Sequence, residues 1–431
     1  MDFQKTTLKN GLRVICVPMP SMESATVQII VGAGTRHEEK RVNGVAHFLE
    51  HMVFKGTKKY PSAQAVSTVV DAIGADINAN TDRERTAYFI KAWEKHLGLA
   101  FDVLSGFINS PVMNPDEIGR EKGVIYEEIA MYDDLPMQKA PDIFEQLLYK
   151  GSPLAWDVLG SKKSIMGVKR RDFVKYRRLL YHPQNMVLTV AGKFDQEEVL
   201  KLAEKYFGKS GGGKLSKKAS HGKAKKANPG GKPEVKLQTK KTEQGHLVLG
   251  VRGNPLGHPD RYKELILATI LGGGMSSRLF TEIRERRGLA YYVRCYPGHY
   301  TDNGYMAARA GVKVDKIDEA IKVILEQFRQ VSKRSGKGSI TKAEFEKAKE
   351  YIKGKLALGL EDTFSASDFF AEQEILEGES KTPEEMMEGI DQVKLSDVQK
   401  LAREFFVNNR LNLAIVGPYD DSERFRKLLK L

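Results

Sequence analysis

The sequence predicts an α+β fold of two duplicated α/β sandwich domains, each with a mixed, largely antiparallel sheet and helices packed on one face. The main observation is a repeat. Residues 185–208 and 410–431 each contain an apolar strand, a glycine, an aromatic residue, an aspartate and an amphipathic helix. A helical segment precedes each copy, at 168–183 and 393–408. Recurrence after roughly 200 residues indicates a duplicated domain and not a solenoid.

The order of elements in the rest of each half supports the same fold. Each half has a strand, then a helix with unusual residues, then a second strand and a second helix. Because strands follow one another and helices are grouped after them, the alternation of a doubly wound sheet is missing. The matching segments are strands 25–34 and 246–254, strands 86–93 and 305–312, and helices 94–108 and 315–331.

A lysine-rich segment separates the two halves. Residues 208–232 carry eight lysines and no acidic residue, so without them the net charge falls from +13 to +5 (13 − 8). Their Gly, Ser, Lys and Ala content predicts a flexible, solvated linker, and binding of RNA or a membrane surface is the less favoured alternative. We therefore expect an N-terminal domain at 1–207, a linker at 208–233 and a C-terminal domain at 234–431.

Composition excludes several classes of protein. At 41% hydrophobic and 29% charged residues, the chain has the balance of a soluble globular protein. It has no run of 18 apolar residues, and its first residues, MDFQKTTLKNGLRVICV, lack the apolar core of a signal peptide. The two cysteines, Cys16 and Cys295, lie in strand-like segments and indicate no disulfide framework. A cytoplasmic location is expected.

The pentad HFLEH, residues 47–51, predicts a metal site. On a helix with Asn43 as its expected N-cap, the side chains of His47, Glu50 and His51 lie at about 0°, 300° and 40°, on one face. Imidazoles four residues apart can bind one zinc ion, and Glu50 then lies close enough to take a proton from a water on that ion. The alternative is a set of satisfied core residues, but buried polar groups without partners would each cost about 1–3 kcal/mol.

A third protein ligand is expected, and residues 114–134 supply one. Asn114 as N-cap and Pro115 in the first turn predict the start of a helix. On that helix Glu121 and Glu128 share the apolar face, whereas Glu127 points elsewhere. We predict Glu128 as the third ligand and Glu121 as a supporting carboxylate that orients a histidine.

These residues carry a family resemblance. HFLEHMVFKGT, with VGAGTRHE before it, NANTDRERTAYF after it and a glutamate 77 positions beyond His51, resembles the pitrilysin-type inverted-zincin metallopeptidases. The likeness is to the short-chain branch that includes the β subunit of mitochondrial processing peptidase and its bacterial relatives. It covers the chain except for the lysine-rich linker. It implies one Zn²⁺ per chain, held by His47, His51 and Glu128, with Glu50 as the base that activates water and the first half as the catalytic domain.

The resemblance also implies residues that bind the substrate. An extended peptide would add to the strand Asp76–Thr81, at Asn78, Ala79 and Asn80, by ordinary β-augmentation. Asn80 stands where an aromatic or apolar residue is expected, which leaves the substrate preference open. In TEIRERRGLAYYV, residues 281–293, Arg284 and Tyr291 would hold the peptide and the developing oxyanion. The alternative for Arg284 is a solvated basic helix.

The expected activity is a zinc endopeptidase for unstructured peptides or presequence-like segments. The alternative is a catalytically silent structural or assembly subunit of the same fold. Because the zinc motif and the Arg284/Tyr291 pair occur in one chain, we expect a homodimer that encloses a chamber. The glycine-rich LGGGMSSRLF at 271–280 lacks the Gly-Lys-Ser/Thr ending of a phosphate loop, so nucleotide binding is not expected.

Overall fold

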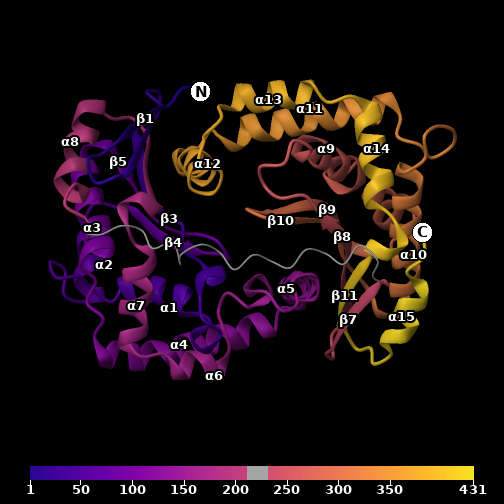
Figure 1. Ribbon diagram of the computed structural model, residues 1–431, viewed down its shortest axis with the longest axis horizontal. Helices are drawn as coiled ribbons and strands as arrows, with labels where there is room; N and C mark the ends of the chain where they lie inside the picture. The colour runs from indigo at the N-terminus through magenta and orange to yellow at the C-terminus, as the bar shows by residue number, and fades with distance from the viewer. Residues whose placement is uncertain (211–231) are drawn as a thin grey trace. The chain divides into compact units, whose positions relative to one another are not determined.

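The computed structural model describes residues 1–210 and 232–431 and divides into two compact units (Figure 1). Most of the predicted linker, residues 211–231, lies outside the described residues. The units differ from the predicted contiguous domains, because 131–155 belongs to the second unit and 357–384 to the first. Unit 1 comprises Met1–Ala130, Ala357–Glu384 and the described residues of Trp156–Gly222, and unit 2 comprises Met131–Ala155, Glu385–Leu431 and the described residues of Lys223–Leu356.

Each unit contains one mixed sheet. In unit 1 the order is β1 (Gln4–Thr7), β2 (Arg13–Pro18), β6 (Met186–Gly192), β3 (Ser24–Val31), β5 (Thr86–Trp93) and β4 (Asp76–Thr81). In unit 2 it is β7 (Glu234–Thr239), β11 (Asn412–Gly417), β8 (Gln244–Gly253), β10 (Asn303–Lys313) and β9 (Ala290–Tyr300). Only β2–β6 and β7–β11 pair in parallel among the described strands.

The two sheets confirm the predicted duplication. Taken in chain order from β2 and from β7, both sheets have the strand order first, fifth, second, fourth, third. Both also have one parallel pair followed by three antiparallel pairs. The predicted strand 86–93 is β5, and 305–312 falls within β10. The predicted fold class of two mixed, largely antiparallel sheets with helices is therefore confirmed.

Most helices follow the predicted pattern and cover one face of a sheet. In unit 1 the core joins Val27 and Ile29 of β3 to Phe48, Phe101 and Phe173 of the covering helices. Unit 1 contains α1 (Val45–Val53), α2 (Ala63–Asp71), α3 (Leu97–Asn109), most of α4 (Pro115–Asp133), α6 (Lys162–Gly167), α7 (Arg170–Leu180) and α8 (Gln196–Phe207). The later helices are α9 (Arg261–Gly272), α10 (Ile317–Val331), α11 (Lys342–Gly359), α13 (Pro383–Asp391), α14 (Leu395–Phe405) and α15 (Ser422–Leu428).

The second face of the unit 1 sheet carries α12 (Thr363–Leu376), a helix from the C-terminal half of the chain. Ala366 and Phe370 of α12 pack with apolar residues of the strands, among them Ile30. Thr363 also bonds across this face, because its hydroxyl lies 2.9 Å from that of Thr26. A sheet whose strands are apolar on both faces needs a covering layer on each face to remove those side chains from water. This explains why α12 packs in unit 1.

The unit 2 sheet is covered in the same way by α5 (Pro136–Leu148), a helix from the N-terminal half. Phe144 of α5 packs in one buried cluster with strand residues of unit 2. The neighbouring Glu145 accepts hydrogen bonds from the hydroxyls of Tyr300 (2.9 Å) and Tyr305 (2.8 Å). The two halves therefore each contribute one helix to the other unit, which the repeat in the sequence did not predict.

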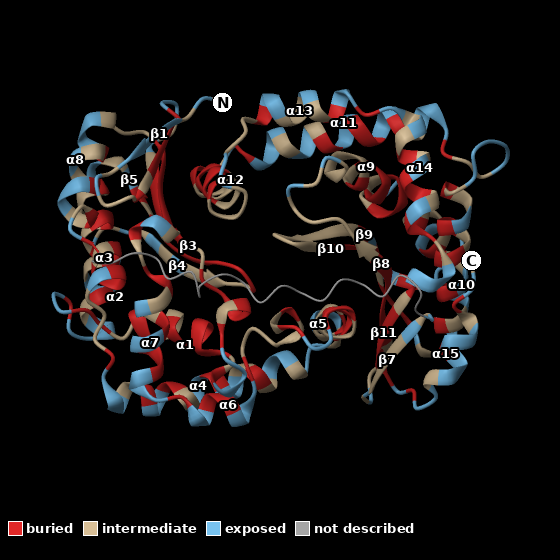
Figure 2. Cartoon of the chain, viewed as in Figure 1, coloured by how far each residue is buried: buried red, intermediate tan, exposed pale blue. Residues whose placement is uncertain are grey.

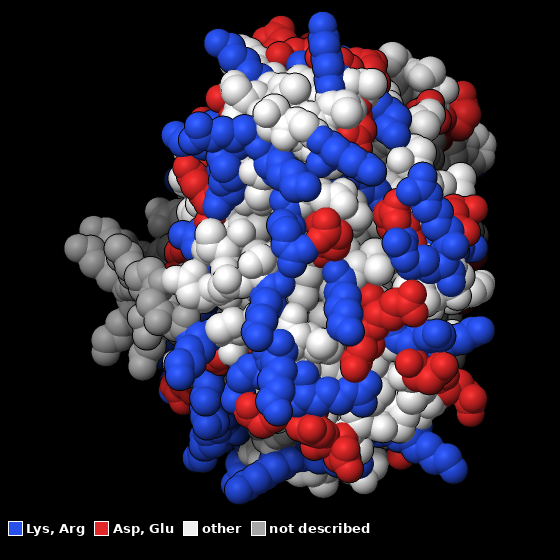
Figure 3. All heavy atoms as spheres, turned by 90° about the vertical axis from the view of Figure 1, so that its right-hand side faces the viewer, with Lys and Arg blue, Asp and Glu red and all other residues white. Residues whose placement is uncertain are grey.

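Burial and charge follow this architecture. Buried residues lie along the sheets and on the inner faces of the helices (Figure 2). The face shown in Figure 3 carries many Lys and Arg side chains, with Asp and Glu among them. Some of the surface cations of unit 2 are paired, as Arg424 is with Asp318 at 2.8 Å. Within 1–210 and 232–431, no helix has the length and hydropathy that a membrane span requires.

Candidate metal centre

Helix α1, which carries the HFLEH pentad, starts differently from the prediction. Its N-cap is Gly44, in the left-handed conformation (φ 94°), and its first residue is Val45, so the predicted N-cap at Asn43 is wrong. The carboxylate of Glu38 caps the helix instead, accepting from the backbone N–H groups of Gly44 (2.8 Å) and Ala46 (2.7 Å). An oxygen acceptor at this end satisfies N–H groups that have no partner within the helix.

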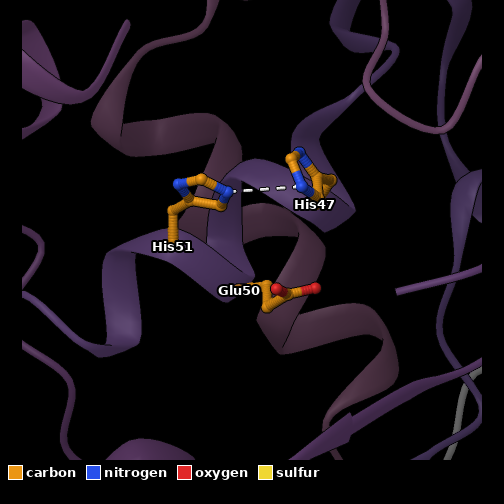
Figure 4. A group of neighbouring side chains, drawn as sticks. All are labelled: His47, Glu50 and His51. Carbon is orange, nitrogen blue, oxygen red and sulfur yellow. Dashed lines mark hydrogen bonds between the residues drawn. The ribbon is translucent and has the colours of Figure 1, made fainter. Parts of the chain in front are cut away.

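The side chains of His47, His51 and Glu128 converge at one point. The Nε2 atoms of the two histidines are 3.3 Å apart (Figure 4). Glu128 of α4 places one oxygen 3.6 Å from Nε2 of His47 and the other 3.4 Å from Nε2 of His51. All three side chains are largely shielded, with exposures of 10%, 19% and 23%. The structure thus brings the three predicted ligands together from two helices of unit 1.

This triangle fits a zinc ion. Ligands about 2.0–2.1 Å from a tetrahedral zinc lie about 3.3–3.4 Å from one another, which is close to the three distances above. The donor set of two imidazoles and one carboxylate is one that zinc accepts, with a fourth position left open. Oε2 of Glu128 is buried, and its contact with Nε2 of His51 is long, at 3.4 Å. A cation at the centre of the triangle would satisfy this oxygen and the nitrogen lone pairs together.

Glu121 lies where a carboxylate that orients a histidine is needed. Its Oε1 accepts a hydrogen bond from Nδ1 of His51 at 2.8 Å, and its Oε2 is 2.6 Å from Nζ of Lys55. With the proton of His51 on Nδ1, the lone pair on Nε2 faces the triangle. The start of α4 confirms Asn114 as its cap, because Oδ1 of Asn114 accepts from the N–H of Asp116 at 2.8 Å.

The electrostatics of the cluster favour one positive charge at its centre. Burial, helped by the nearby charge of His51, lowers the pKa of His47 to about 4. Burial also acts to lower the pKa of His51, but the hydrogen bonds to Glu121 and Glu128 outweigh it and raise that pKa to about 9. The pKa of Glu128 is lowered, since its hydrogen bond to His51 outweighs the effect of burial. Without a metal, the carboxylates stabilise a proton on His51. A bound cation would supply that positive charge in place of the proton.

Glu50 lies beside the ligand triangle. It has an oxygen within 4.8 Å of ligand nitrogens of both histidines, and no hydrogen bond joins it to them in Figure 4. The oxygens of Glu128 are closer, at 3.6 and 3.4 Å from the Nε2 atoms of His47 and His51. The hydroxyl of Thr81 donates to Oε2 of Glu50 at 2.5 Å. Burial raises the pKa of Glu50 although this bond opposes the shift, which suits a group that takes up a proton.

The predicted substrate strand is β4, which lies at the edge of the unit 1 sheet and pairs only with β5 among the described strands. Asn78 is exposed, and Ala79 and Asn80 are partly buried. Oδ1 of Asn78 accepts from the N–H of Ala79 at 2.8 Å, so this N–H points away from β5. The edge is therefore open for an added strand, and peptide binding there stays a prediction.

Arg284 and Tyr291 lie together in unit 2. Arg284 is on a π-helical segment, Phe280–Glu285, and its guanidinium carbon lies 5.7 Å from the centre of the Tyr291 ring. Both side chains are exposed, Tyr291 at 76%. The proximity is a cation–π contact, and the pair is free to bind a partner. Its role with the substrate stays a prediction.

Three residues at the site had no role assigned from the sequence. They are Glu38, which caps α1, Lys55, which pairs with Glu121, and Thr81, which bonds to Glu50. The signal available in the sequence for Glu38 was an acidic residue shortly before a helix that starts after a glycine. The pairings of Lys55 and Thr81 cross between elements and have no signal in local spacing.

Comparison with known proteins identifies the family. Residues 13–162 match the family model described as insulinase (peptidase family M16), and residues 167–352 match the peptidase M16 inactive domain. The chain belongs to peptidase family M16. This confirms the resemblance to pitrilysin-type metallopeptidases. It also agrees with the duplication, in which the second half of this M16 chain lacks the HFLEH pentad.

Relatives of this M16 chain include proteins named as proteases. It is 35% identical over 420 residues to the uncharacterized zinc protease YmxG of Bacillus subtilis, covering 96% of this chain and 98% of that protein. It is 33% identical over 429 residues to the uncharacterized zinc protease SCO5738 of Streptomyces coelicolor, covering 98% and 91%. A solved protease from Helicobacter pylori shares the fold, with a TM-score of 0.87 and 24% identity over 97% of this chain and 99% of that one.

Proposed function

We propose that this M16 chain is a zinc-dependent endopeptidase that hydrolyses unstructured peptides or presequence-like segments. The observation that carries the proposal is the convergence of His47, His51 and Glu128, with 3.3 Å between the imidazole nitrogens and a Glu128 oxygen 3.4 to 3.6 Å from each, which is close to the ligand spacing around zinc. The names of the relatives as zinc proteases support the same metal and the same class of reaction.

The residues of the site have separate tasks. A zinc ion, when bound, polarises a carbonyl and makes a water more acidic. His47, His51 and Glu128 would hold the ion, and Glu121 keeps the His51 ring in the orientation that this requires. Glu50 takes the proton of the attacking water and delivers it to the leaving amine. Burial raises the pKa of Glu50, which makes it a better acceptor for that proton.

The proposed class of substrate is inferred from the open edge strand β4. A peptide that adds a strand to β4 needs free backbone N–H and C=O groups, which an unstructured segment offers along its length and a folded domain mostly uses in its own helices and sheets. Asn78, Ala79 and Asn80 would contact its backbone, and Arg284 and Tyr291 would hold the peptide and the oxyanion. We propose a cytoplasmic homodimer that encloses the substrate in a chamber. Sedimentation that shows a stable, fully active monomer at assay concentration would contradict this part.

The test combines metal analysis with peptide cleavage. Wild-type protein and Glu50→Gln are expected to retain about one zinc per chain, because the ligand set is intact, whereas hydrolysis is lost in the variant. The matched control is Glu127→Gln on the exposed face of α4, which should keep both zinc and activity. Equal cleavage by wild type and Glu50→Gln would refute the role of the base. Absence of zinc from both would favour a silent structural subunit.

A further inference from the structure

Thr81 makes a contact with Glu50 that local sequence does not predict. The last residue of β4, it donates through Oγ1 to Oε2 of Glu50 at 2.5 Å. Its hydroxyl also lies 3.3 Å from that of Thr86, but the Thr86 hydroxyl donates to the carbonyl of Ala33 at 2.7 Å. The single proton of Thr81 therefore goes to Glu50, and a short bond to a carboxylate is a strong one.

The backbone around Thr81 is held firmly. The turn after β4 is closed by Asp82, whose N–H donates to the carbonyl of Arg85 at 2.9 Å and whose Oδ1 accepts from the N–H of Arg85 at 2.8 Å. Arg85 in turn pairs with Asp368 of α12 at 3.0 Å. Because threonine is also restricted about its first side-chain bond, the hydroxyl has a defined direction.

Thr81 also faces the open edge of the sheet. In an antiparallel pair, residues whose backbone groups bond to the partner alternate with residues whose groups point outward. Asp82 and Arg85 are bonded to each other, so the next pair, Thr81 and Thr86, points outward. The outward N–H of Ala79, two residues earlier, agrees with this alternation. The backbone of Thr81 is thus placed where an added strand would pair, while its side chain bonds to Glu50.

We propose that Thr81 is a positioning residue that, from the strand on which a peptide would pair, fixes the orientation of the Glu50 carboxylate. The inference rests on the proposed peptidase function. The backbone of Thr81 would pair with the peptide, while its hydroxyl, held by the turn after β4, keeps the Glu50 carboxylate directed at the reacting water. Loss of the hydroxyl leaves the backbone contacts intact and releases the carboxylate. The effect therefore falls on kcat and not on KM.

The kinetic test compares Thr81→Val, which keeps the shape and loses the donor, with Thr81→Ser, which keeps the donor. On an internally quenched peptide that the wild type cleaves, Thr81→Val is expected to lower kcat about 10- to 100-fold with KM within about threefold. Thr81→Ser should stay within about threefold in both, and zinc content should not change. The matched control is Thr26→Val, which removes a hydroxyl bond (2.9 Å to Thr363) on the other face of the sheet.

A second measurement does not depend on activity. In metal-free protein, the loss of stability in Thr81→Val combined with Glu50→Ala should be smaller than the sum of the two single losses, since both remove the same bond. Thr26→Val combined with Glu50→Ala should be additive. Additive losses for Thr81 and Glu50, wild-type kcat in Thr81→Val, or equal defects in the Val and Ser variants would overturn the proposal. Wild-type protein without zinc or cleavage would instead refute the peptidase function, and the stability cycle would still decide the Thr81–Glu50 link.

Discussion

The role of Glu121 gives the sharpest test of the metal centre, because Glu121 acts on zinc affinity through its hydrogen bond to the ligand His51. Nδ1 of His51 donates to Glu121 at 2.8 Å, and the two side chains are 19% and 5% exposed. A hydrogen bond to a charged partner contributes about 1.5–3 kcal/mol, and a neutral one about 0.5–1.5. Glu121→Gln can keep a neutral bond and loses about 1–2 kcal/mol, whereas Glu121→Ala loses the whole bond.

These energies convert to zinc affinity. Since about 1.4 kcal/mol is a factor of ten, Glu121→Gln is expected to bind zinc about 5- to 30-fold more weakly. Glu121→Ala should bind it about 10- to 100-fold more weakly, the range found when such supporting partners are removed. The assay is competition for zinc with a chromophoric chelator at fixed pH. The control is Glu127→Gln, the same change on the exposed face of the same helix. Equal affinity of the Glu121 and Glu127 variants would refute the reasoning.

Three further predictions concern stability, each measured by urea unfolding of metal-free protein. Phe370→Ala removes a fully buried ring of α12 from the unit 1 sheet and should lower the free energy of unfolding by about 3–5 kcal/mol. Phe369 is half-buried, so Phe369→Ala should lower it by less. Equal losses would contradict the packing. Gly44→Ala should lower the free energy of unfolding by at least about 1 kcal/mol, because φ is +94° and the added Cβ would lie 2.5 Å from the carbonyl oxygen of Leu159. An unchanged free energy of unfolding would contradict this. Burial raises the pKa of Glu38 from 4.5 to about 8, so the folded state binds its proton more tightly. The stability of the wild type relative to Glu38→Gln should therefore fall as pH rises from about 4.5 to about 8, and a difference that grows over this range would contradict it.

Much of the fold could be predicted from the sequence because it depends on local periodicity. The alternation and length of apolar runs located the strands that became β5 and β10, and the repeated strand–Gly–aromatic–Asp–helix order revealed the duplication. The cap of α4 at Asn114 was also predictable, since the cap and the N–H it binds are two residues apart. The cap of α1 was not, because the side chain that supplies it, Glu38, is six residues before Gly44 and folds back.

The exchange of α5 and α12 shows the limit of that reasoning. The apolar residues of α5 lie on one side of the helix, whereas those of α12 are spread around it, and neither pattern tells which sheet the helix covers. The choice depends on which apolar sheet face remains open after the local helices have packed, a property of the assembled units. The unit boundaries at 131–155 and 357–384 therefore differ from the contiguous domains expected from the linker.

For the site, the sequence by itself determined which chemistry is available. Residues three and four apart on a helix share a face whatever the rest of the chain does, so His47, Glu50 and His51 were grouped by helix geometry alone. The tertiary structure decided how those groups are completed: Glu128 within 3.6 Å of both histidines, Glu121 on Nδ1 of His51, and Thr81 on Glu50. The physical reason is that these partners are far apart in the sequence. Local periodicity does not encode such contacts, and they form only when α4 and β4 pack against α1.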